Sequence, residues 1–374
     1  MQARIWLSGR CFECRVERIE PSADAWIVKT RARRYFRFDT PTIALLRQLM
    51  SGEGPDLEQP EQASALSFVQ GHLIPLGIFA PVDEAAEAPA AHASTGAMRW
   101  QRQLLAARQV RPLAAMLAPL YAPWVLLPLM LLCLALLARY AMHSTELLGY
   151  RDLLTYAPQE LLLLVAVAVG RGLLHELGHA AACWRYTGSV GAIGFGIFMT
   201  TPVLYCDVSD IHLLPRRAKA MVGMAGTVMD IVFLTLMVGL AGSDIGVMKV
   251  FWLSLMAIAF NLVPFYRNDG FWVINDLAGT DDLLKQSLAA CRAGKARLRD
   301  WALLAFMAGC AGAIVVLGWM FATEAGPQQL VDIARLMPSF PGVVLALVTG
   351  LQYAALVFGL LSALKLLPRL MRRK

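Results

Sequence analysis

Two histidines and one glutamate lie close together within an apolar stretch of this chain. They belong to the sequence His175-Glu176-Leu177-Gly178-His179, which has the pattern H-E-x-x-H. Residues four positions apart share one face of a helix, so His175 and His179 can bind one zinc ion together. Glu176 can reach a water at the metal without being a ligand. Zinc acidifies such a water and a carboxylate accepts its proton, so the motif predicts a metallohydrolase.

The sequence on both sides of the motif is that of a membrane-spanning helix. Leucine, valine and alanine fill residues 161–169, and alanines occupy 180–182. H-E-x-x-H strings also occur by chance in proteins that bind no metal. Ionisable residues inside a membrane helix are energetically costly, however, and are usually functional. Their metal-binding spacing in such a helix favours a zinc site in or near a bilayer.

Composition and hydropathy predict a polytopic membrane protein. Hydrophobic residues make up 57% of the chain and charged residues 16%, below the roughly 25% charged residues of soluble proteins. The segments long enough to span a bilayer are about 120–141, 160–182, 220–241, 250–266, 301–322 and 342–364. The first 115 residues are polar and mixed, and no cleavable signal peptide is expected there. We therefore predict a mainly α-helical fold with a six-span core.

The basic residues predict the orientation of these spans. They cluster before the first, third and fifth spans and after the sixth, whereas the loops near 142–159, 242–249 and 323–341 contain few. Basic loops stay in the cytoplasm, so we expect an integral protein of the bacterial inner (cytoplasmic) membrane with both termini cytoplasmic. The net charge of +7 then follows from topology, and we expect no nucleic-acid partner. The second span runs inward, which places both histidines in its inner half.

A catalytic zinc ion needs a third protein ligand and an open position for water. Asp269 follows the inward fourth span, so it reaches the depth of His179. Pro264 and Gly270 interrupt the helix there and free the carboxylate to turn inward. Asp230, in the middle of the third span, is the less favoured alternative.

The order of these motifs resembles that of the site-2 protease family of intramembrane zinc metallopeptidases. The H-E-x-x-H of one span is followed by N-x-x-P from Asn261 to Pro264 and by D-G at Asp269 and Gly270. The resemblance covers about residues 160–276. One difference is Asn268, which stands where the family often has leucine. It leaves the ligand in place and makes its surroundings more polar.

The family resemblance implies a role for each matching residue. Two histidines and the D-G aspartate bind zinc in that family, which assigns His175, His179 and Asp269 to Zn²⁺ here. The glutamate of the motif is the general base, which assigns that role to Glu176. The resemblance thus implies peptide-bond hydrolysis by a membrane-embedded enzyme.

Residues 188–206 are rich in glycine, β-branched and aromatic residues, and are too broken for a helical span. We expect an extended, partly re-entrant segment that is shielded by protein, with a plain connecting loop as the alternative. A free strand edge there could hydrogen-bond an extended peptide. From Gly194 to Asp210 the sequence resembles the peptide zinc metalloprotease branch of the family, which is found with peptide-export and modified-peptide systems. Asp207 and Asp210 are expected to cap the following turn rather than to contact substrate.

Two further polar residues in the spans have more than one possible role. Arg171 lies one turn before His175 on the same face. It could stabilise an oxyanion, bind a substrate carboxylate or pair with Asp230, and we favour the ion pair. Asn261 could donate a hydrogen bond to the tetrahedral intermediate, or satisfy backbone groups that Pro264 frees.

The N-terminal region, residues 1–81, predicts a soluble cytoplasmic α+β domain of winged-helix type. Residues 26–30 and 34–38 read as a hairpin. Two helices follow, with apolar faces formed by Ile43, Leu46 and Leu49, and by Leu66, Val69 and Leu73. Over about 25–81 this order resembles the PqqD type of peptide-binding domain, which captures leader peptides in modified-peptide pathways. The expected contact is an exposed strand edge beside Trp26–Thr30, and a structural cytoplasmic cap is the alternative.

Composition also indicates the remaining boundaries. Residues 82–118 read as a linker and interfacial segment, 119–276 as the metallopeptidase membrane core, and 277–374 as a cytoplasmic loop with two C-terminal spans. Cys11 and Cys14 form a C-x-x-C without a partner pair, which disfavours a second metal site or a redox pair. The other five cysteines are scattered and show no disulfide framework.

These features together predict a membrane-embedded zinc endopeptidase. It would hydrolyse a peptide bond of a precursor peptide, for leader removal or maturation, near the cytoplasmic membrane face. The expected partners are a peptide or membrane-anchored protein substrate, the lipid bilayer, and peptide-modification or export proteins. One alternative is a regulatory intramembrane protease that cleaves a transmembrane signalling protein. The other is a non-catalytic peptide-binding or export component with structural zinc, which the intact Glu176 disfavours because a structural site needs no base.

Overall fold

The computed structural model describes residues 3–337 except 8, 22–24, 52–58, 60–61, 83–97, 149–156, 199–200, 264–267, 281, 321–322 and 324–325, together with positions 339, 343 and 346. By packing, the chain divides into two units. The N-terminal unit comprises residues up to 98 together with 209–215, and the helical unit comprises the rest. Each unit has a hydrophobic core of its own.

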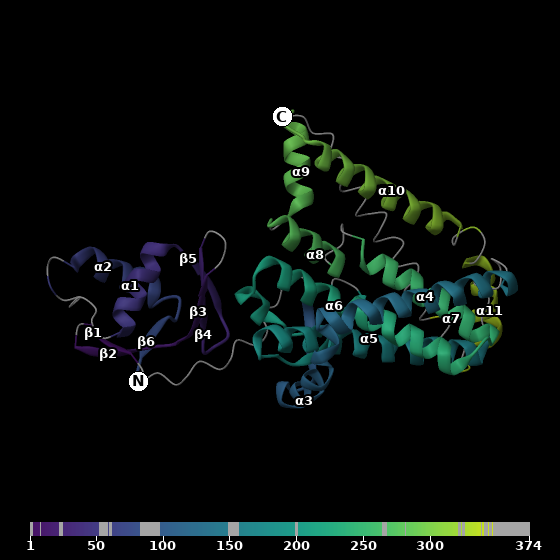
Figure 1. Ribbon diagram of the computed structural model, residues 1–374, viewed down its shortest axis with the longest axis horizontal. Coiled ribbons are helices and arrows are strands. Elements are labelled where there is room, and N and C mark those ends of the chain that lie inside the picture. Colours follow the sequence, from purple (N-terminus) through teal and green to yellow (C-terminus); the bar gives the residue numbers. More distant parts are fainter. Residues whose placement is uncertain are drawn as a thin grey trace. The chain divides into compact units, whose positions relative to one another are not determined.

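Small antiparallel sheets and short helices build the N-terminal unit (Figure 1). One sheet has the order β1-β2-β6 and contains β1 (Arg4–Leu7), β2 (Arg10–Cys14) and β6 (Phe79–Pro81). The other has the order β3-β4-β5 and contains β3 (Val16–Pro21), β4 (Trp26–Thr30) and β5 (Tyr35–Phe38). The helices are α1 (Thr40–Ser51), α2 (Ala63–Phe68) and the π-helix η2 (Val69–Leu73).

The core of this unit lies between its helices and its strands. Ile43, Leu46 and Leu49 of α1 are buried, as their helical spacing predicts. Val69 and Leu73 of η2 are buried against the same cluster. Each buried leucine or isoleucine contributes roughly 1.5–3 kcal/mol of hydrophobic stabilisation. This amphipathic pattern therefore holds the helices on the sheets.

Strand β4 lies in the middle of its sheet. β3 pairs with one edge of β4 and β5 pairs with the other, both antiparallel. The predicted hairpin of residues 26–30 and 34–38 is therefore confirmed. The expected free strand edge beside Trp26–Thr30 is wrong, because both edges of that strand are already hydrogen-bonded. The outer edges of this sheet belong to β3 and β5.

Cys11 and Cys14 lie on opposite faces of β2. Side chains alternate along a strand, so residues three positions apart point in opposite directions. Cys14 is buried in the core, whereas Cys11 is partly exposed, and both thiols are free. The undistorted strand thus keeps the two sulfurs from binding one metal ion or forming a disulfide.

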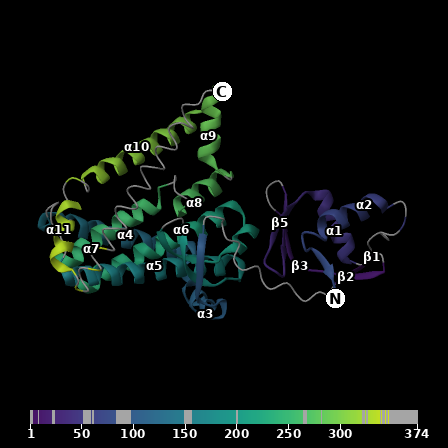
Figure 2. The ribbon, with the colours of Figure 1, turned by 180° about the vertical axis from the view of Figure 1, so that it is seen from behind.

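The helical unit combines long helices with a three-stranded sheet among its described residues (Figures 1 and 2). Its helices are α3 (Ala107–Leu117), η3 (Ala118–Tyr121), α4 (Pro123–Leu147), α5 (Pro158–Thr187), α6 (Arg216–Ala241), α7 (Ile245–Asn261), α8 (Asp269–Ala278), α9 (Leu283–Arg292), α10 (Leu298–Met320) and α11 (Gly326–Leu336). The sheet has the order β7-β8-β9 and contains β7 (Met98–Leu105), β8 (Ile193–Phe198) and β9 (Thr201–Cys206). Strand β7 and helix α3 lie in the segment expected to be a linker and interfacial region.

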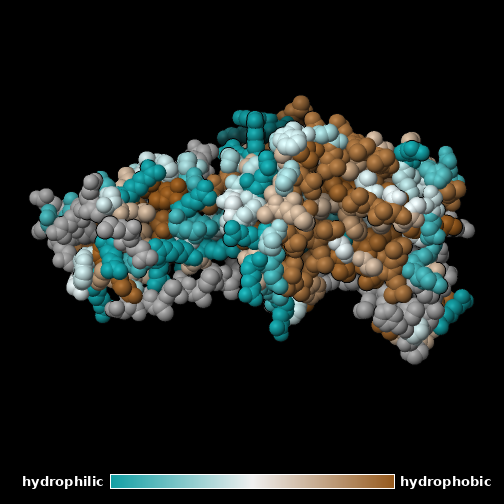
Figure 3. All heavy atoms as spheres, turned by 60° about the horizontal axis from the view of Figure 1, so that its bottom comes forward, coloured by the Kyte–Doolittle hydropathy of each residue, from teal (hydrophilic) through white to brown (hydrophobic). Residues whose placement is uncertain are grey.

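Three described helices are long and apolar enough to cross a membrane, namely Pro123–Leu147, Leu162–Thr187 and Arg216–Ala241. They coincide with the first three predicted spans. Hydrophobic side chains cover much of the face of this unit that Figure 3 shows. Helix α7 is apolar but only 17 residues long. Helix α10 overlaps the fifth predicted span, and the sixth lies almost entirely outside the described residues, so the six-span topology stays a prediction.

The extended segment expected at 188–206 is a β-hairpin. β8 and β9 pair antiparallel, with Ile193 opposite Cys206 and Phe198 opposite Thr201. Its insertion into a bilayer as a re-entrant segment stays a prediction.

Helix α5 is set by signals at both of its ends. Proline stands in its first turn, and the Glu160 carboxylate accepts a hydrogen bond from the Ala157 N–H at 2.7 Å. Gly188 ends the helix with φ 68°, a left-handed conformation that favours glycine. The H-E-x-x-H motif therefore lies inside a continuous helix, away from both of its ends.

Candidate metal centre

The structure brings His175, His179 and Asp269 together. Helix α5 places the two imidazoles one turn apart, with their Nε2 atoms separated by 3.2 Å. Asp269, the first residue of α8, directs Oδ2 to 3.1 Å from Nε2 of His175 and 3.3 Å from Nε2 of His179. The three donor atoms thus form a nearly equilateral triangle. We call this group the donor triangle.

The donor triangle has the size that a tetrahedral zinc site requires. Zinc binds nitrogen and oxygen ligands at about 2.0–2.1 Å, so two ligand atoms in a tetrahedron lie roughly 3.3–3.4 Å apart. The three separations in the triangle fall at or just below that value. Imidazole nitrogens with one carboxylate oxygen are also a donor set of catalytic zinc sites. This group could therefore hold a metal ion.

Helix α6 closes one side of the donor triangle through a glycine. A Cβ atom at Gly226 would lie 2.5 Å from Nε2 of both His175 and His179. Gly178, inside the motif, lets the two helices approach in the same way, because a Cβ there would lie 2.6 Å from the carbonyl oxygen of Ala225. The buried Tyr121 hydroxyl donates to that same carbonyl at 2.9 Å. The sequence alone assigned no role to Gly178 or Gly226. The only feature that could have indicated one is a run of small residues in an apolar span.

The Nδ1 atom of each imidazole contacts an oxygen acceptor on α6. Nδ1 of His175 lies 2.9 Å from Oδ2 of Asp230, and Nδ1 of His179 lies 2.7 Å from the carbonyl oxygen of Val222. Both partners belong to α6 and accept a hydrogen bond when Nδ1 is protonated, which leaves each Nε2 free to bind metal. Asp230 therefore lies behind a ligand and outside the donor triangle.

Arg171 forms an ion pair with the buried carboxylate of Asp230. Its guanidinium donates to Oδ2 of Asp230 at 2.8 Å, and Asp230 is 1% exposed. This is the ion pair favoured from the sequence over an oxyanion or substrate contact. A buried carboxylate without a partner would be strongly unfavourable. Arg171 thus stabilises the acceptor that orients His175.

Asn261 contacts a member of the donor triangle. Its Nδ2 donates to Oδ2 of Asp269 at 2.8 Å, a role absent from both of its sequence-based alternatives. Asn268 caps α8 and also donates to the carbonyl oxygen of Phe260 at 2.9 Å. Gly270 packs against the Leu262 backbone so closely that a Cβ would collide with it. These contacts fix where α8 begins and so place its first residue, Asp269.

Glu176 lies next to the donor triangle and remains partly exposed. Its carboxylate accepts a hydrogen bond from the backbone N–H of Cys206, at the end of β9. Gly172, one turn earlier on α5, packs closely against the same strand. A Cβ added there would lie 3.0 Å from Cδ1 of Leu204. The hairpin thus borders the motif on the side of its carboxylate.

This site combines three side chains that could hold a metal ion, an adjacent carboxylate and a strand. Among the residues that the structure describes, this is the group of histidines and carboxylates that could hold a metal ion. Comparisons with protein-family models, with curated proteins and with solved structures found no match.

Proposed function

We propose that this chain is a membrane-embedded zinc endopeptidase that cleaves a precursor peptide near the cytoplasmic membrane face. The observation that carries the proposal is the donor triangle with Glu176 beside it. A structural metal site needs no neighbouring base, so this carboxylate favours hydrolysis. The long apolar helix α5, which carries both histidines and Glu176, favours a site within the membrane.

The proposed reaction is hydrolysis of an amide by water. Zinc in this site would polarise the scissile carbonyl and make the attacking water more acidic. Glu176 accepts a proton from that water and later donates it to the leaving amine. The acceptors Asp230 and Val222 keep the histidines oriented, and Asn261 does the same for Asp269. All of these groups come from four helices that are already packed together, so little reorganisation is needed.

Strand β9 offers a way to present the substrate. In the described residues it is the outer strand of the sheet β7-β8-β9. An extended peptide that added to this edge would gain backbone hydrogen bonds. It would also pass Cys206, whose N–H contacts Glu176. The scissile amide would then be held close to the general base.

We further infer that the N-terminal unit captures the leader of the precursor. Since β4 is central, a peptide that joined the described sheet β3-β4-β5 would add to the outer edge of β3 or β5. Capture by this unit would raise the local concentration of precursor at the membrane site.

Removing zinc from the full-length protein is expected to stop cleavage, and restoring it should recover the activity. The protein in proteoliposomes would be treated with phenanthroline and then supplied with Zn²⁺ or Mg²⁺. Mg²⁺ should fail to restore activity because it prefers oxygen ligands, whereas two of the three donors are imidazoles. A short precursor peptide found encoded beside this protein would serve as the substrate, and mass spectrometry would measure its cleavage. Cleavage that persists without metal would contradict the proposal. Cleavage of a transmembrane signalling protein instead of the precursor would favour the regulatory-protease alternative.

The proposed topology places both termini in the cytoplasm. Reporter fusions after about residues 95, 285 and 374 are expected to show a cytoplasmic position, because basic clusters adjoin these sites. A fusion near residue 330 should show an external position. Alkaline phosphatase and green fluorescent protein would serve as paired reporters. An external signal at the C-terminus would mean that the number of spans is odd.

A further inference from the structure

The segment 209–215 belongs to the N-terminal unit although the chain reaches it from the helical unit. It contains the 3-10 helix η5 (Ser209–Leu213), follows β9 and leads directly into α6. Asp210 in this segment is 1% exposed. The sequence favoured capping of the following turn over a substrate contact for Asp210. The structure instead buries it among residues of β4, β5 and the turn between them.

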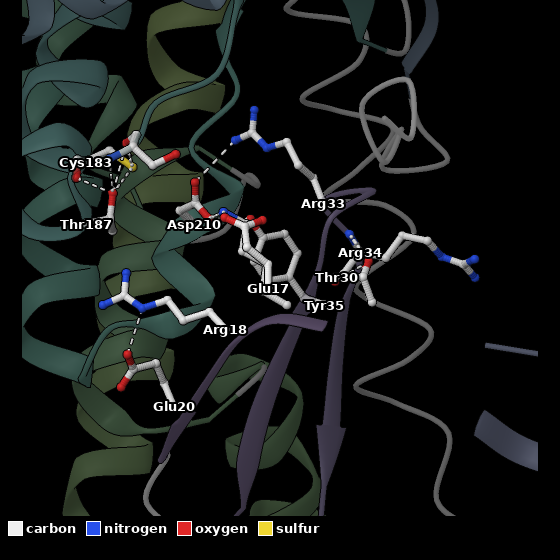
Figure 4. A network of polar contacts seen from close by, with 12 residues as sticks. Glu17, Arg18, Glu20, Thr30, Arg33, Arg34, Tyr35, Cys183, Thr187 and Asp210 are labelled. Atoms are coloured by element: carbon white, nitrogen blue, oxygen red, sulfur yellow. Dashed lines mark hydrogen bonds and ion pairs between the residues drawn. The ribbon is translucent and has the colours of Figure 1, made fainter. Parts of the chain in front are cut away.

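Three side chains of the N-terminal unit contact the Asp210 carboxylate. Oδ1 lies 2.8 Å from Nζ of Lys29 and accepts a hydrogen bond from the Tyr35 hydroxyl at 2.7 Å. Oδ2 lies 3.4 Å from a guanidinium nitrogen of Arg33. Figure 4 shows Arg33 and Tyr35 directed toward Asp210. We call these four residues the Asp210 clasp.

The Asp210 clasp is a buried and tightly specified contact. Lys29 is itself buried, so both charges have left water, and Lys29 also pairs with Glu17 at 3.0 Å. Burial and the neighbouring carboxylate raise the pKa of the Tyr35 phenol, which keeps the hydroxyl protonated as a donor. The Tyr35 ring also packs on His212, with centroids 5.4 Å apart. Removing the Asp210 carboxylate would take a partner from Lys29, Tyr35 and Arg33 together.

The turn that supplies Arg33 has an unusual backbone. Arg33 has φ 57°, the one left-handed conformation among the described residues other than glycine. Such a conformation is unfavourable for a residue with a Cβ and persists where surrounding contacts require it. The contact of its side chain with Asp210 is one contact of that kind.

A short path leads from the Asp210 clasp to the general base. The Cys206 N–H donates a hydrogen bond to the Glu176 carboxylate. The backbone of the next residue, Asp207, forms two further hydrogen bonds across the hairpin. Its N–H donates to the carbonyl of Ala192 and its carbonyl accepts from the N–H of Gly191, both at 2.9 Å. Only Val208 and Ser209 separate Asp207 from Asp210. A change in the position of Asp210 therefore reaches Cys206, the last residue of β9, through three residues.

The same segment also leads to the acceptors behind the histidines. Helix α6 begins at Arg216, directly after the segment, and carries Val222, Gly226 and Asp230. The Asp210 clasp thus holds the chain between two elements of the metal centre. We propose that Asp210 is a positioning residue through which the N-terminal unit keeps β9 in register with Glu176. This inference rests on the proposed peptidase function.

The test compares Asp210→Asn and Tyr35→Phe with Glu20→Gln in the full-length protein. Glu20 is the matched control because its ion pair with Arg18, at 2.8 Å, lies on the surface of the same sheet. The substrate is a precursor fragment that contains the cleavage site without the leader, so leader capture does not contribute. Measurements are kcat, KM, zinc content and hydrogen exchange of the β9 amides.

We expect Asp210→Asn to lower kcat by up to about a hundredfold, the size of effect that a displacement of about 1 Å in an active site can have. KM and zinc content should change little, and exchange of the β9 amides should accelerate. Tyr35→Phe should show a smaller decrease in kcat of about tenfold, and adding it to Asp210→Asn should lower kcat no further, because both act through one contact. Glu20→Gln should behave like the wild type.

Unchanged kcat together with unchanged β9 exchange in Asp210→Asn would overturn the inference. If exchange accelerates throughout β3, β4 and β5, the variant has unfolded its domain, and Tyr35→Phe then decides because it keeps both ion pairs. A wild-type protein that cleaves no peptide would overturn the proposed function instead. The exchange comparison does not depend on activity, so it would still test the Asp210 clasp.

Discussion

Replacing Glu176 by glutamine is expected to lower cleavage of the precursor by roughly 100- to 10,000-fold, the range attributed to general acid–base catalysis. Glutamine has the shape of glutamate but cannot accept a proton at neutral pH. The donor triangle contains no atom of Glu176, so the variant should retain its metal. Single-turnover cleavage in proteoliposomes and metal analysis of the same sample would measure both properties.

Cleavage and zinc content have to be interpreted together in this experiment. Loss of both activity and zinc would show only that the site had collapsed. Loss of activity with full zinc content assigns the proton transfer to Glu176. Undiminished cleavage by Glu176→Gln would exclude this site as the catalytic centre. The Glu20→Gln protein again serves as a control when the leaderless fragment is the substrate, since it removes a surface carboxylate and leader capture then does not contribute.

Replacing Asp269 by alanine is expected to remove most of the zinc from the purified protein. Oδ2 of Asp269 is the only oxygen of the donor triangle, and two imidazoles alone bind zinc far more weakly. Replacing Asp230 by alanine should leave the triangle intact. Since Asp230 accepts a hydrogen bond from His175, the loss should weaken zinc binding by only about 10- to 100-fold.

Titration with a zinc indicator would measure these affinities in detergent. Full zinc content in Asp269→Ala with complete loss in Asp230→Ala would reverse the assignment of the third ligand. Gly226→Ala offers an independent check, because it deletes no donor. Its new methyl group would lie 2.5 Å from both Nε2 atoms and should exclude the metal. A Gly226→Ala protein that binds zinc like the wild type would contradict the close approach of α6.

Part of the fold follows from local sequence patterns. The apolar runs predicted the three long helices, since length and composition suffice to recognise such helices. The helical spacing of Ile43, Leu46 and Leu49 predicted the buried face of α1. In contrast, the strand order of the N-terminal unit could not be read from the sequence. It depends on pairing between β3 and β4, and that pairing left β4 without the free edge that we expected.

Part of the candidate metal centre also follows from local sequence patterns. His175 and His179 share a face because a helix repeats every 3.6 residues, and Glu176 follows from the same motif. Asp269 was selected by its predicted depth beside a helix break, which required a hypothesis about topology as well as a motif. The structure places its carboxylate 3.1 Å from His175.

The remaining features were decided by tertiary packing alone. Gly226 closes the site, Asp230 stands behind His175, and Asn261 holds Asp269, yet none of these contacts has a local sequence signal. Each depends on how α5, α6 and α8 are rotated and how closely they approach. Asp210 is the clearest case, because its partners Lys29 and Tyr35 are more than 170 residues away in the chain. A periodic pattern shows which face of a helix or strand is apolar, whereas the partner of a buried polar group is set by the element that packs against it.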